Sequence, residues 1–157
     1  MKSSARVVVI GGGVVGASVL YHLTKAGWTD VVLVERKQLT AGSTWHAAGG
    51  MHTLNGDPNV ARLQQYTVNL YKEIEKESGQ NCGIHLPGGL MLADTPERLD
   101  FLRMAQARGR YLGMHMEMLS MKEAKALNPL LEEKYFVGAL YDEDEGSVDP
   151  YGVTHAY

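Results

Sequence analysis

The chain has 157 residues, of which 45% are hydrophobic, so it is large and apolar enough for one folded domain and is not a disordered tail. Its 18 acidic and 15 basic residues give a net charge of -3 without a basic run, which argues against nucleic acid as a partner. A single cysteine excludes an internal disulfide, and no run of about 18 apolar residues is present to span a membrane.

The chain begins with a predicted strand, turn, helix and strand. Residues 6–10 are β-branched and almost continuously apolar, which is typical of a parallel strand buried on both faces. Apolar residues recur at helical spacing over residues 14–26, and Gly27 is placed to end this helix. Residues 31–34 repeat the strand pattern and lead to the acidic Glu35. Together these segments predict a Rossmann-like FAD-binding or NAD-binding βαβ unit of an α/β fold.

The remainder of the chain predicts additional mixed α+β elements. A loop rich in small residues leads to a helix between Pro58 and Ser78, with an apolar face that includes Val60 and Leu63. Caps, prolines and short apolar runs then predict two strand pieces around residues 87–89, helices over 96–111 and 121–127, strands over 115–119 and 135–141, and a helix from Pro150. The acidic run at residues 142–145 is predicted to be a solvated loop.

The turn after the first strand, Gly11-Gly12-Gly13-Val14-Val15-Gly16, fits the dinucleotide-binding pattern. Gly11 permits a tight turn, Gly13 lets the backbone approach a pyrophosphate, and Gly16 lets the helix pack closely on the strand. The helix N-terminus at Val14 offers backbone N–H groups and the positive end of the helix dipole to the phosphates.

Glu35, at the end of the second strand, completes this pattern. Its carboxylate is placed to accept hydrogen bonds from the ribose hydroxyls of an adenosine, and a negative charge there disfavours the 2′-phosphate of NADP. An ordinary glycine-rich turn would lack the flanking strand, helix and acid. The pattern therefore predicts a bound dinucleotide, and its position near the N-terminus favours FAD over NAD without excluding NAD.

The loop that follows carries the most specific motif of the chain, Gly42-Ser43-Thr44-Trp45-His46-Ala47-Ala48-Gly49. It resembles the dimethylglycine and sarcosine dehydrogenase family, within the D-amino-acid-oxidase-like flavoproteins, and the likeness continues more loosely over essentially the whole chain. The resemblance implies that His46 is joined covalently to the 8α-methyl carbon of FAD. A neutral imidazole is a competent nucleophile, and the small residues after it leave room for a ring edge. The alternative is a hydrogen-bonded loop histidine.

The resemblance also assigns cofactor contacts along the chain. Val14 and Val15 contribute to the phosphate turn, Glu35 and Arg36 to the adenosine end, and residues 42–50 to the flavin side. The predicted cofactor-binding residues are Gly11, Gly13, Val14, Val15, Gly16, Glu35, Arg36, Gly42, Ser43, Thr44, Trp45, His46, Ala47, Ala48, Gly49 and Gly50. Arg36 could equally be a solvated charge, and the loop hydroxyls could be local turn stabilisers.

By the same resemblance, the implied activity is the oxidation of the C–N bond of a small N-methylated amino acid, with hydride transfer to FAD. The implied electron acceptor is an electron-transfer flavoprotein or oxygen, and a tetrahydrofolate domain can follow in the complete protein. The catalytic residues are expected beyond Tyr157. The alternatives are a non-catalytic FAD-binding module, a regulatory relative, an isolated fragment unable to turn over, and a plain NAD-binding domain.

A doubly wound sheet needs a third parallel strand, and none is recognisable after Glu35, so residues 1–157 are expected to be the N-terminal part of an incomplete FAD/NAD(P)-binding domain. Within it we expect the ADP-binding unit over 5–36, a flavin-side loop over 37–56 and the start of substrate-side elements over 57–157. The histidines have no metal-ligand spacing, which predicts no metal site. The single cysteine fits the cytoplasm, or the mitochondrial matrix for a processed form.

Overall fold

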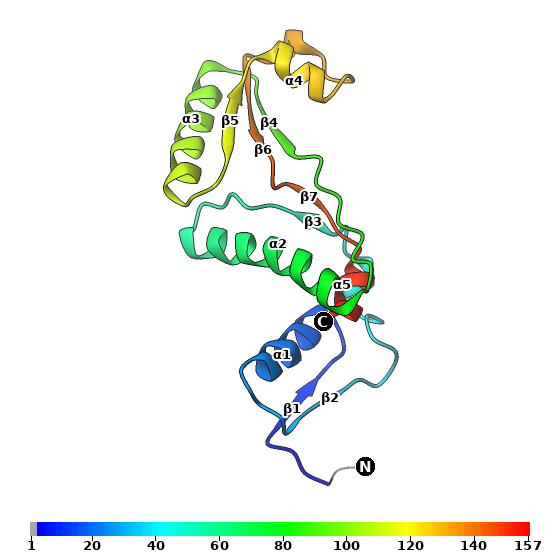
Figure 1. Ribbon diagram of the computed structural model, residues 1–157. Coiled ribbons are helices and arrows are strands. Elements are labelled where there is room, and N and C mark those ends of the chain that lie inside the picture. Colours follow the sequence, from blue (N-terminus) through cyan, green and yellow to red (C-terminus); the bar gives the residue numbers. More distant parts are fainter. Residues whose placement is uncertain (1–2) are drawn as a thin grey trace. The chain divides into compact units, whose positions relative to one another are not determined.

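The computed structural model describes residues 3–157, and the chain forms two compact units. Unit 1 contains the chain up to Gly49 with Leu70–Ile84 and Ser147–Tyr157, and unit 2 contains Gly50–Asn69 and His85–Gly146. Helices and strands occur in both units, as labelled in Figure 1. The predicted α/β class with additional mixed elements is therefore confirmed.

Unit 1 begins with the predicted βαβ unit. Strand β1 (Val7–Ile10) is followed by helix α1 (Val14–Lys25) and strand β2 (Val31–Val34), and the two strands pair in parallel along their whole length. After α1 ends, Gly27 adopts a left-handed conformation with φ of +85°, which is common where a helix terminates. The Rossmann-like βαβ prediction is confirmed.

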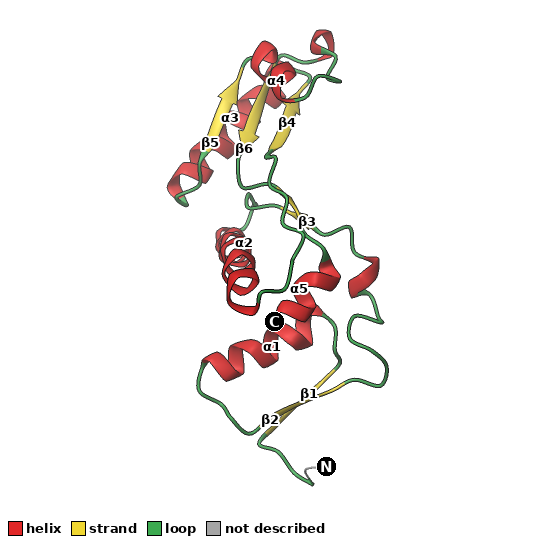
Figure 2. Ribbon diagram, turned by 45° about the vertical axis from the view of Figure 1, so that its right-hand side comes forward, coloured by secondary structure: helices red, strands yellow, loops and turns green. Residues whose placement is uncertain are grey.

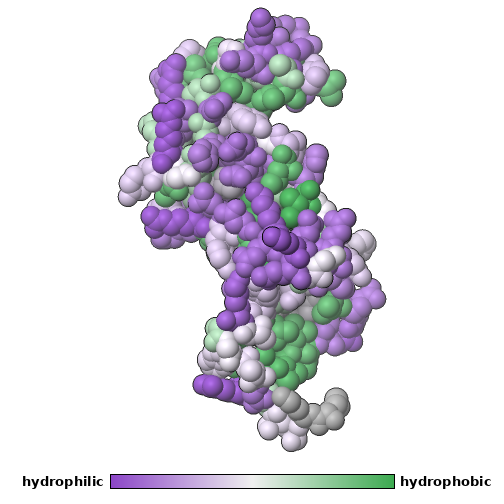
Figure 3. Space-filling model, viewed as in Figure 1, coloured by the Kyte–Doolittle hydropathy of each residue, from purple (hydrophilic) through white to green (hydrophobic). Residues whose placement is uncertain are grey.

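The prediction that β1 is buried on both faces is wrong. Helix α1 packs against both strands, whereas Val8 and Ile10 are 51% and 86% exposed. Successive side chains of a strand alternate between its two faces, so one covering helix buries only every second residue. Figure 3 shows a hydrophobic area on the surface in the region of β1 and β2.

The other helices of unit 1 are the second half of α2 (Pro58–Ser78) and α5 (Pro150–Ala156). Asp149 caps α5 because its carboxylate accepts hydrogen bonds from the N–H groups of Tyr151 and Gly152, at 3.0 and 3.1 Å. The apolar core shared by these segments consists of the buried residues Leu70, Ile74, Cys82, Val153 and Ala156. The predicted start of α5 is confirmed.

Unit 2 is built on an antiparallel, three-stranded sheet in the order β4 (Gly89–Ala93), β6 (Gly138–Asp142) and β5 (Met116–Leu119). Helix α3 (Pro96–Tyr111) packs against all three strands, and α4 (Met121–Leu127) packs against β5 and β6 (Figure 2). Two shorter strands, β3 (Gly50–Met51) and β7 (Gly146–Ser147), form a separate pair. A 3-10 turn, η2 (Glu133–Tyr135), belongs to unit 2, whereas the other, η1 (Thr44–His46), belongs to unit 1.

Local capping signals in unit 2 are confirmed. The Thr95 hydroxyl accepts a hydrogen bond from the N–H of Arg98 at 3.2 Å, where α3 begins. Ser120 and Glu123 form the predicted capping box at the start of α4. These signals involve residues a few positions apart, and the local sequence is therefore sufficient to predict them.

Two expectations about burial are wrong in unit 2. In the first half of α2, Val60 and Leu63 are 41% and 63% exposed, and the small Ala61 packs into the core instead. Asp142 does not lie in a solvated loop: it ends β6, is 2% exposed, and accepts a hydrogen bond from the buried Thr53 hydroxyl at 2.6 Å. A buried carboxylate requires such a partner, and the partner is distant in sequence.

Candidate cofactor site

The glycine turn between β1 and α1 has the geometry that the dinucleotide pattern predicts. Gly11 adopts a φ of +112°, which residues with a side chain rarely adopt. A Cβ atom at Gly16 would lie 1.9 Å from the backbone oxygen of Gly11, so only glycine allows the helix to pack this closely. This close packing brings the N-terminus of α1 to the end of β1, where a pyrophosphate site requires it.

The start of α1 is contacted by a residue from the following loop. Gly13 is the N-cap, has no side chain with which to cap the helix, and precedes a first turn without acidic residues. The N–H of Val14 donates to the Thr44 hydroxyl at 3.0 Å, and a Cβ atom at Gly13 would lie 2.9 Å from that same hydroxyl oxygen. A helix start without acidic side chains suits an anionic phosphate, and its Val14 N–H group is bonded to Thr44.

Glu35 directly follows β2 and contacts the glycine turn. One carboxylate oxygen accepts the N–H of Gly12 at 2.7 Å and the other accepts the N–H of Lys37 at 2.9 Å. The hydrogen bond from Gly12, followed by that from Lys37, holds the pKa of the Glu35 carboxyl below its usual range. Each carboxylate oxygen retains acceptor capacity, so a ribose hydroxyl can still bind.

Acidification is expected to remove the contribution of Glu35 to stability. Because its pKa is lower in the folded chain, this contribution is present above the unfolded pKa and is lost as pH falls through the folded pKa. Urea unfolding of the parent and of Glu35→Gln should therefore differ at neutral pH, and the difference should shrink as the pH falls below the usual range of a glutamate carboxyl. Parallel pH profiles for the two chains would contradict this assignment.

Sequence reasoning missed Gly12 in the glycine turn and Thr40, which contacts it from the loop after β2. Gly12 is buried, and a Cβ atom there would lie 2.5 Å from Leu39 and 3.0 Å from Glu35. Its carbonyl accepts the N–H of Thr40, a buried residue held at φ of +69°, which is unusual for a β-branched side chain. The triple glycine was the available signal for Gly12, whereas no sequence pattern indicates Thr40.

The Trp45-His46 pair lies in the 3-10 turn η1. The N–H of His46 donates to the Ser43 carbonyl at 3.2 Å, and the N–H of Ala47 donates to the Thr44 carbonyl at 3.1 Å. The two aromatic rings lie with their centroids 4.3 Å apart, and both side chains are exposed. The imidazole of His46 is thus accessible to a ligand on the same unit as the glycine turn.

The end of this loop is fixed within unit 1. Gly49 adopts a φ of +72°, its carbonyl accepts the N–H of Val148 at 2.9 Å, and a Cβ atom would lie 2.1 Å from the Val148 oxygen. Ala48 and Gly42 are exposed, as is Arg36, and Gly50 begins β3 in unit 2. All predicted cofactor residues except Gly50 therefore belong to unit 1.

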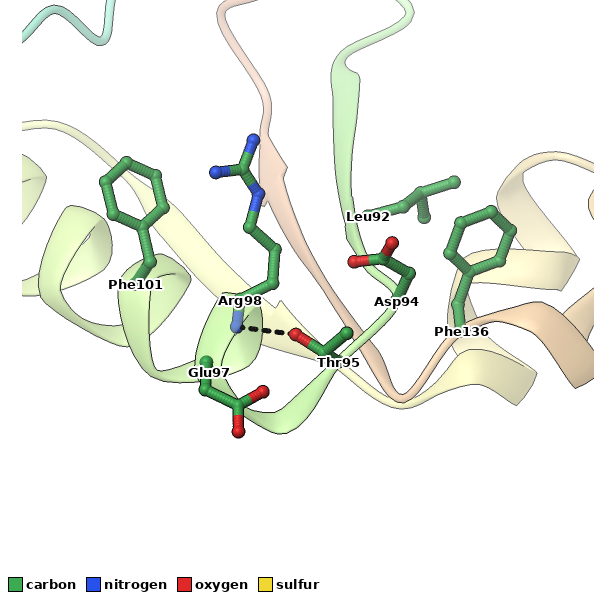
Figure 4. Close-up of a pocket in the computed structure, with 7 residues that line it drawn as sticks. All are labelled: Leu92, Asp94, Thr95, Glu97, Arg98, Phe101 and Phe136. Atoms are coloured by element: carbon green, nitrogen blue, oxygen red, sulfur yellow. Dashed lines mark hydrogen bonds between the residues drawn. The ribbon is translucent and has the colours of Figure 1, made fainter.

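Other candidate positions lie apart from this set. His52 contacts Glu145 at 3.2 Å within unit 2. An open pocket of about 650 Å³ at the start of α3 contains none of the predicted cofactor residues; Figure 4 shows its lining of Leu92, Asp94, Thr95, Glu97, Arg98, Phe101 and Phe136. Among residues 3–157, no three His, Cys, Asp or Glu side chains gather closely enough to hold a metal ion. In the same part of the chain, no helix has the length and apolar character needed to cross a membrane.

Known proteins similar to this chain are flavoproteins and their relatives. A family model described as DAO, FAD dependent oxidoreductase, matches residues 6–157. The chain is 41% identical to mitochondrial dimethylglycine dehydrogenase of Rattus norvegicus, over 99% of this chain and 18% of that protein. It is 39% identical to mitochondrial sarcosine dehydrogenase of Homo sapiens, over 97% of this chain and 17% of that protein. It is also 36% identical to the mitochondrial pyruvate dehydrogenase phosphatase regulatory subunit of Mus musculus, over 99% of this chain and 18% of that protein.

The fold is similar to that of solved enzymes. The crystal structure of L-proline dehydrogenase from P. horikoshii matches with a TM-score of 0.89 and 26% identity, covering 99% of this chain and 41% of that one. The chain spans under a fifth of the length of the dimethylglycine and sarcosine dehydrogenases, at 18% and 17%. The resemblance inferred from the Trp45-His46 loop is confirmed, because the family match extends over nearly the whole chain. The chain belongs to the DAO family of FAD-dependent oxidoreductases.

Proposed function

We propose that the chain is the cofactor-binding part of an enzyme that oxidises a small N-methylated amino acid, of the dimethylglycine or sarcosine type, by hydride transfer to FAD. The observation that carries the proposal is the position of the Trp45-His46 turn, held against the α1 N-terminus through Thr44 and Val14. The similarity to dimethylglycine and sarcosine dehydrogenases supports the choice of substrate class.

The ADP-binding part of the proposed site lies in unit 1. Residues 5–36 hold the ADP portion of FAD, residues 37–56 line its flavin side, and residues 57–157 begin the substrate-side elements. The α1 N-terminus binds the pyrophosphate, and Glu35 binds the ribose. The fit of the chain to FAD is supported by the close approach of Gly16 to Gly11 and by the exposed imidazole of His46.

His46 is proposed to bind FAD covalently. A bond forms between one imidazole nitrogen and the 8α-carbon of the flavin, while that carbon and the imidazole each lose one proton. The two electrons released pass to dioxygen, which combines with two protons to give hydrogen peroxide. The small side chains of Ala47 and Ala48 beside His46 leave space for the ring edge.

In the complete protein, bound FAD supplies the hydride acceptor, and the residues described here hold and orient it. The residues that bind the amine are proposed to lie elsewhere in the protein. The electrons are proposed to pass to an electron-transfer flavoprotein or to oxygen, and a folate domain is a further proposed component. The mitochondrial names of the relatives support a mitochondrial location, for which the matrix is proposed, over a cytoplasmic one.

A second candidate is a non-catalytic FAD-binding module. It is favoured by the 36% identity to a regulatory subunit, which is close to the identity with the dehydrogenases. The Trp45-His46 pair favours the enzyme, because a covalent link to the flavin has no evident use in a module that only binds it.

Anaerobic titration of the FAD-loaded protein with dimethylglycine and with sarcosine separates these candidates. The enzyme is expected to lose its oxidised-flavin absorbance as the amine is added, because the hydride reduces the flavin. A yellow protein whose spectrum is unchanged by either amine would favour the binding module. A protein that binds NAD and no flavin would exclude both.

A further inference from the structure

We propose that Thr44 is a positioning residue: its hydrogen bond to Val14 holds the turn that carries His46, and covalent attachment of FAD depends on it. The inference rests on the proposed function, since it assumes attachment at His46. It adds a role for a hydroxyl that the sequence alone does not distinguish from a local turn stabiliser.

The Thr44 hydroxyl satisfies a donor that α1 cannot satisfy itself. The first N–H groups of a helix have no partner within the helix, and the N-cap Gly13 has no side chain to supply one. Thr44 is 30 residues further along the chain, and its hydroxyl accepts the N–H of Val14 at 3.0 Å. The bond therefore joins the phosphate turn directly to the proposed attachment turn.

Gly13 makes room for this hydroxyl. A Cβ atom at Gly13 would lie 2.9 Å from the Thr44 Oγ1 atom, which is closer than real Cβ contacts allow. The second glycine of the dinucleotide pattern therefore has a role besides admitting a pyrophosphate. It lets the attachment turn approach the start of α1.

The position of Thr44 is transmitted to His46 through a short, closed segment of backbone. Thr44 begins η1 and His46 ends it, and two hydrogen bonds, from His46 to Ser43 and from Ala47 to Thr44, close the turn. The side chains of Trp45 and His46 are exposed, so their own packing does not fix them. The turn also contacts α5, and the hydrogen bond of Thr44 links it to the start of α1.

Bond formation at His46 is sensitive to such an anchor. The imidazole nitrogen and the flavin carbon must approach to about 3 to 3.5 Å in the correct orientation, and a displacement of about 1 Å can cost about 100-fold in rate. Reversible binding of FAD depends on many contacts along unit 1 and is much less sensitive to one of them. Loss of the Thr44 hydroxyl should therefore slow attachment more than it weakens binding.

Thr44→Val tests the proposal, because valine keeps the branched shape and removes the acceptor. Flavin-free protein is mixed with FAD, and covalent flavin is followed by intact mass and by in-gel fluorescence. We expect attachment to slow by about 10- to 100-fold, with a much smaller change in FAD affinity measured in a His46→Ala background. Thr44→Ser should retain the parent rate, as should Thr29→Val, which changes an exposed threonine of the same unit.

The possible outcomes are distinguishable. Equal attachment rates in the parent and Thr44→Val would overturn this inference alone, whereas absence of covalent flavin in the parent would overturn the proposed attachment together with it. Amide exchange on the parent provides a check that requires no variant to fold. A Val14 amide that exchanges as fast as an unprotected peptide would also overturn the inference.

Discussion

His46→Ala is expected to abolish covalently bound FAD. Under denaturing conditions, the flavin-loaded parent should show an FAD-sized mass increment, and the variant should show none. The residues that follow His46 in the loop, Ala47, Ala48 and Gly49, have no nucleophilic side chain that could replace the imidazole. Reversible binding should persist in the variant, because the glycine turn and Glu35 are unchanged.

His52→Ala is the matched control for His46→Ala. His52 is the next histidine along the chain, is exposed, and contacts Glu145 in unit 2. The control should retain the full mass increment. A mass increment that persists in His46→Ala and disappears in His52→Ala would place the covalent link at His52 and contradict the prediction. An increment that persists in both variants would place the link elsewhere in the chain and also contradict it.

The elements that the sequence predicts well depend on neighbouring residues. The βαβ unit follows from the apolar spacing of α1 and from the glycines at its start, which act within one turn. The caps at Thr95, Ser120 and Asp149 also involve groups two or three residues apart. Chemistry of this kind can be read from a short window of sequence.

Features that depend on distant partners were not predictable. Thr53 and Asp142 are 89 residues apart. The acidic run at residues 142–145 therefore does not indicate that Asp142 is buried and accepts a hydrogen bond from a distant hydroxyl. The exposure of Ile10 depends on how many elements cover β1, which an apolar run does not specify. Tertiary packing determines the burial of both residues, and the local sequence does not predict it.

The candidate site also combines features that depend on neighbouring residues with features that depend on distant partners. The sequence indicated Gly11, Gly16 and Glu35 through a known spacing, whereas the contact of Thr44 with Val14 depends on how the intervening loop folds back. Thr40 belongs to the same category, because its N–H reaches the Gly12 carbonyl only in a left-handed conformation that threonine seldom adopts.

Gly16→Ala is expected to have the largest effect on stability. A Cβ atom at this position would lie 1.9 Å from the Gly11 carbonyl oxygen and 3.5 Å from the side chain of Val9. The nearest atom belongs to the backbone, so relief requires α1 to move away from β1. Within a helix, alanine is normally favoured over glycine by about 1 kcal/mol, but overpacking of a core costs about 1 to 3 kcal/mol and sometimes more.

The clash therefore exceeds the gain in helix propensity, and we expect a net loss of about 2 kcal/mol or more in the free energy of unfolding. Urea unfolding of the parent and Gly16→Ala measures this loss, and FAD affinity should fall with it because the phosphate turn is displaced. Gly42→Ala is the control for stability, since no atom lies within 4 Å of a Cβ built there. A Gly16→Ala chain as stable as the parent would mean that helix and strand do not approach as closely as the Gly11 and Gly16 backbones indicate, and the dinucleotide assignment would lose its main structural support.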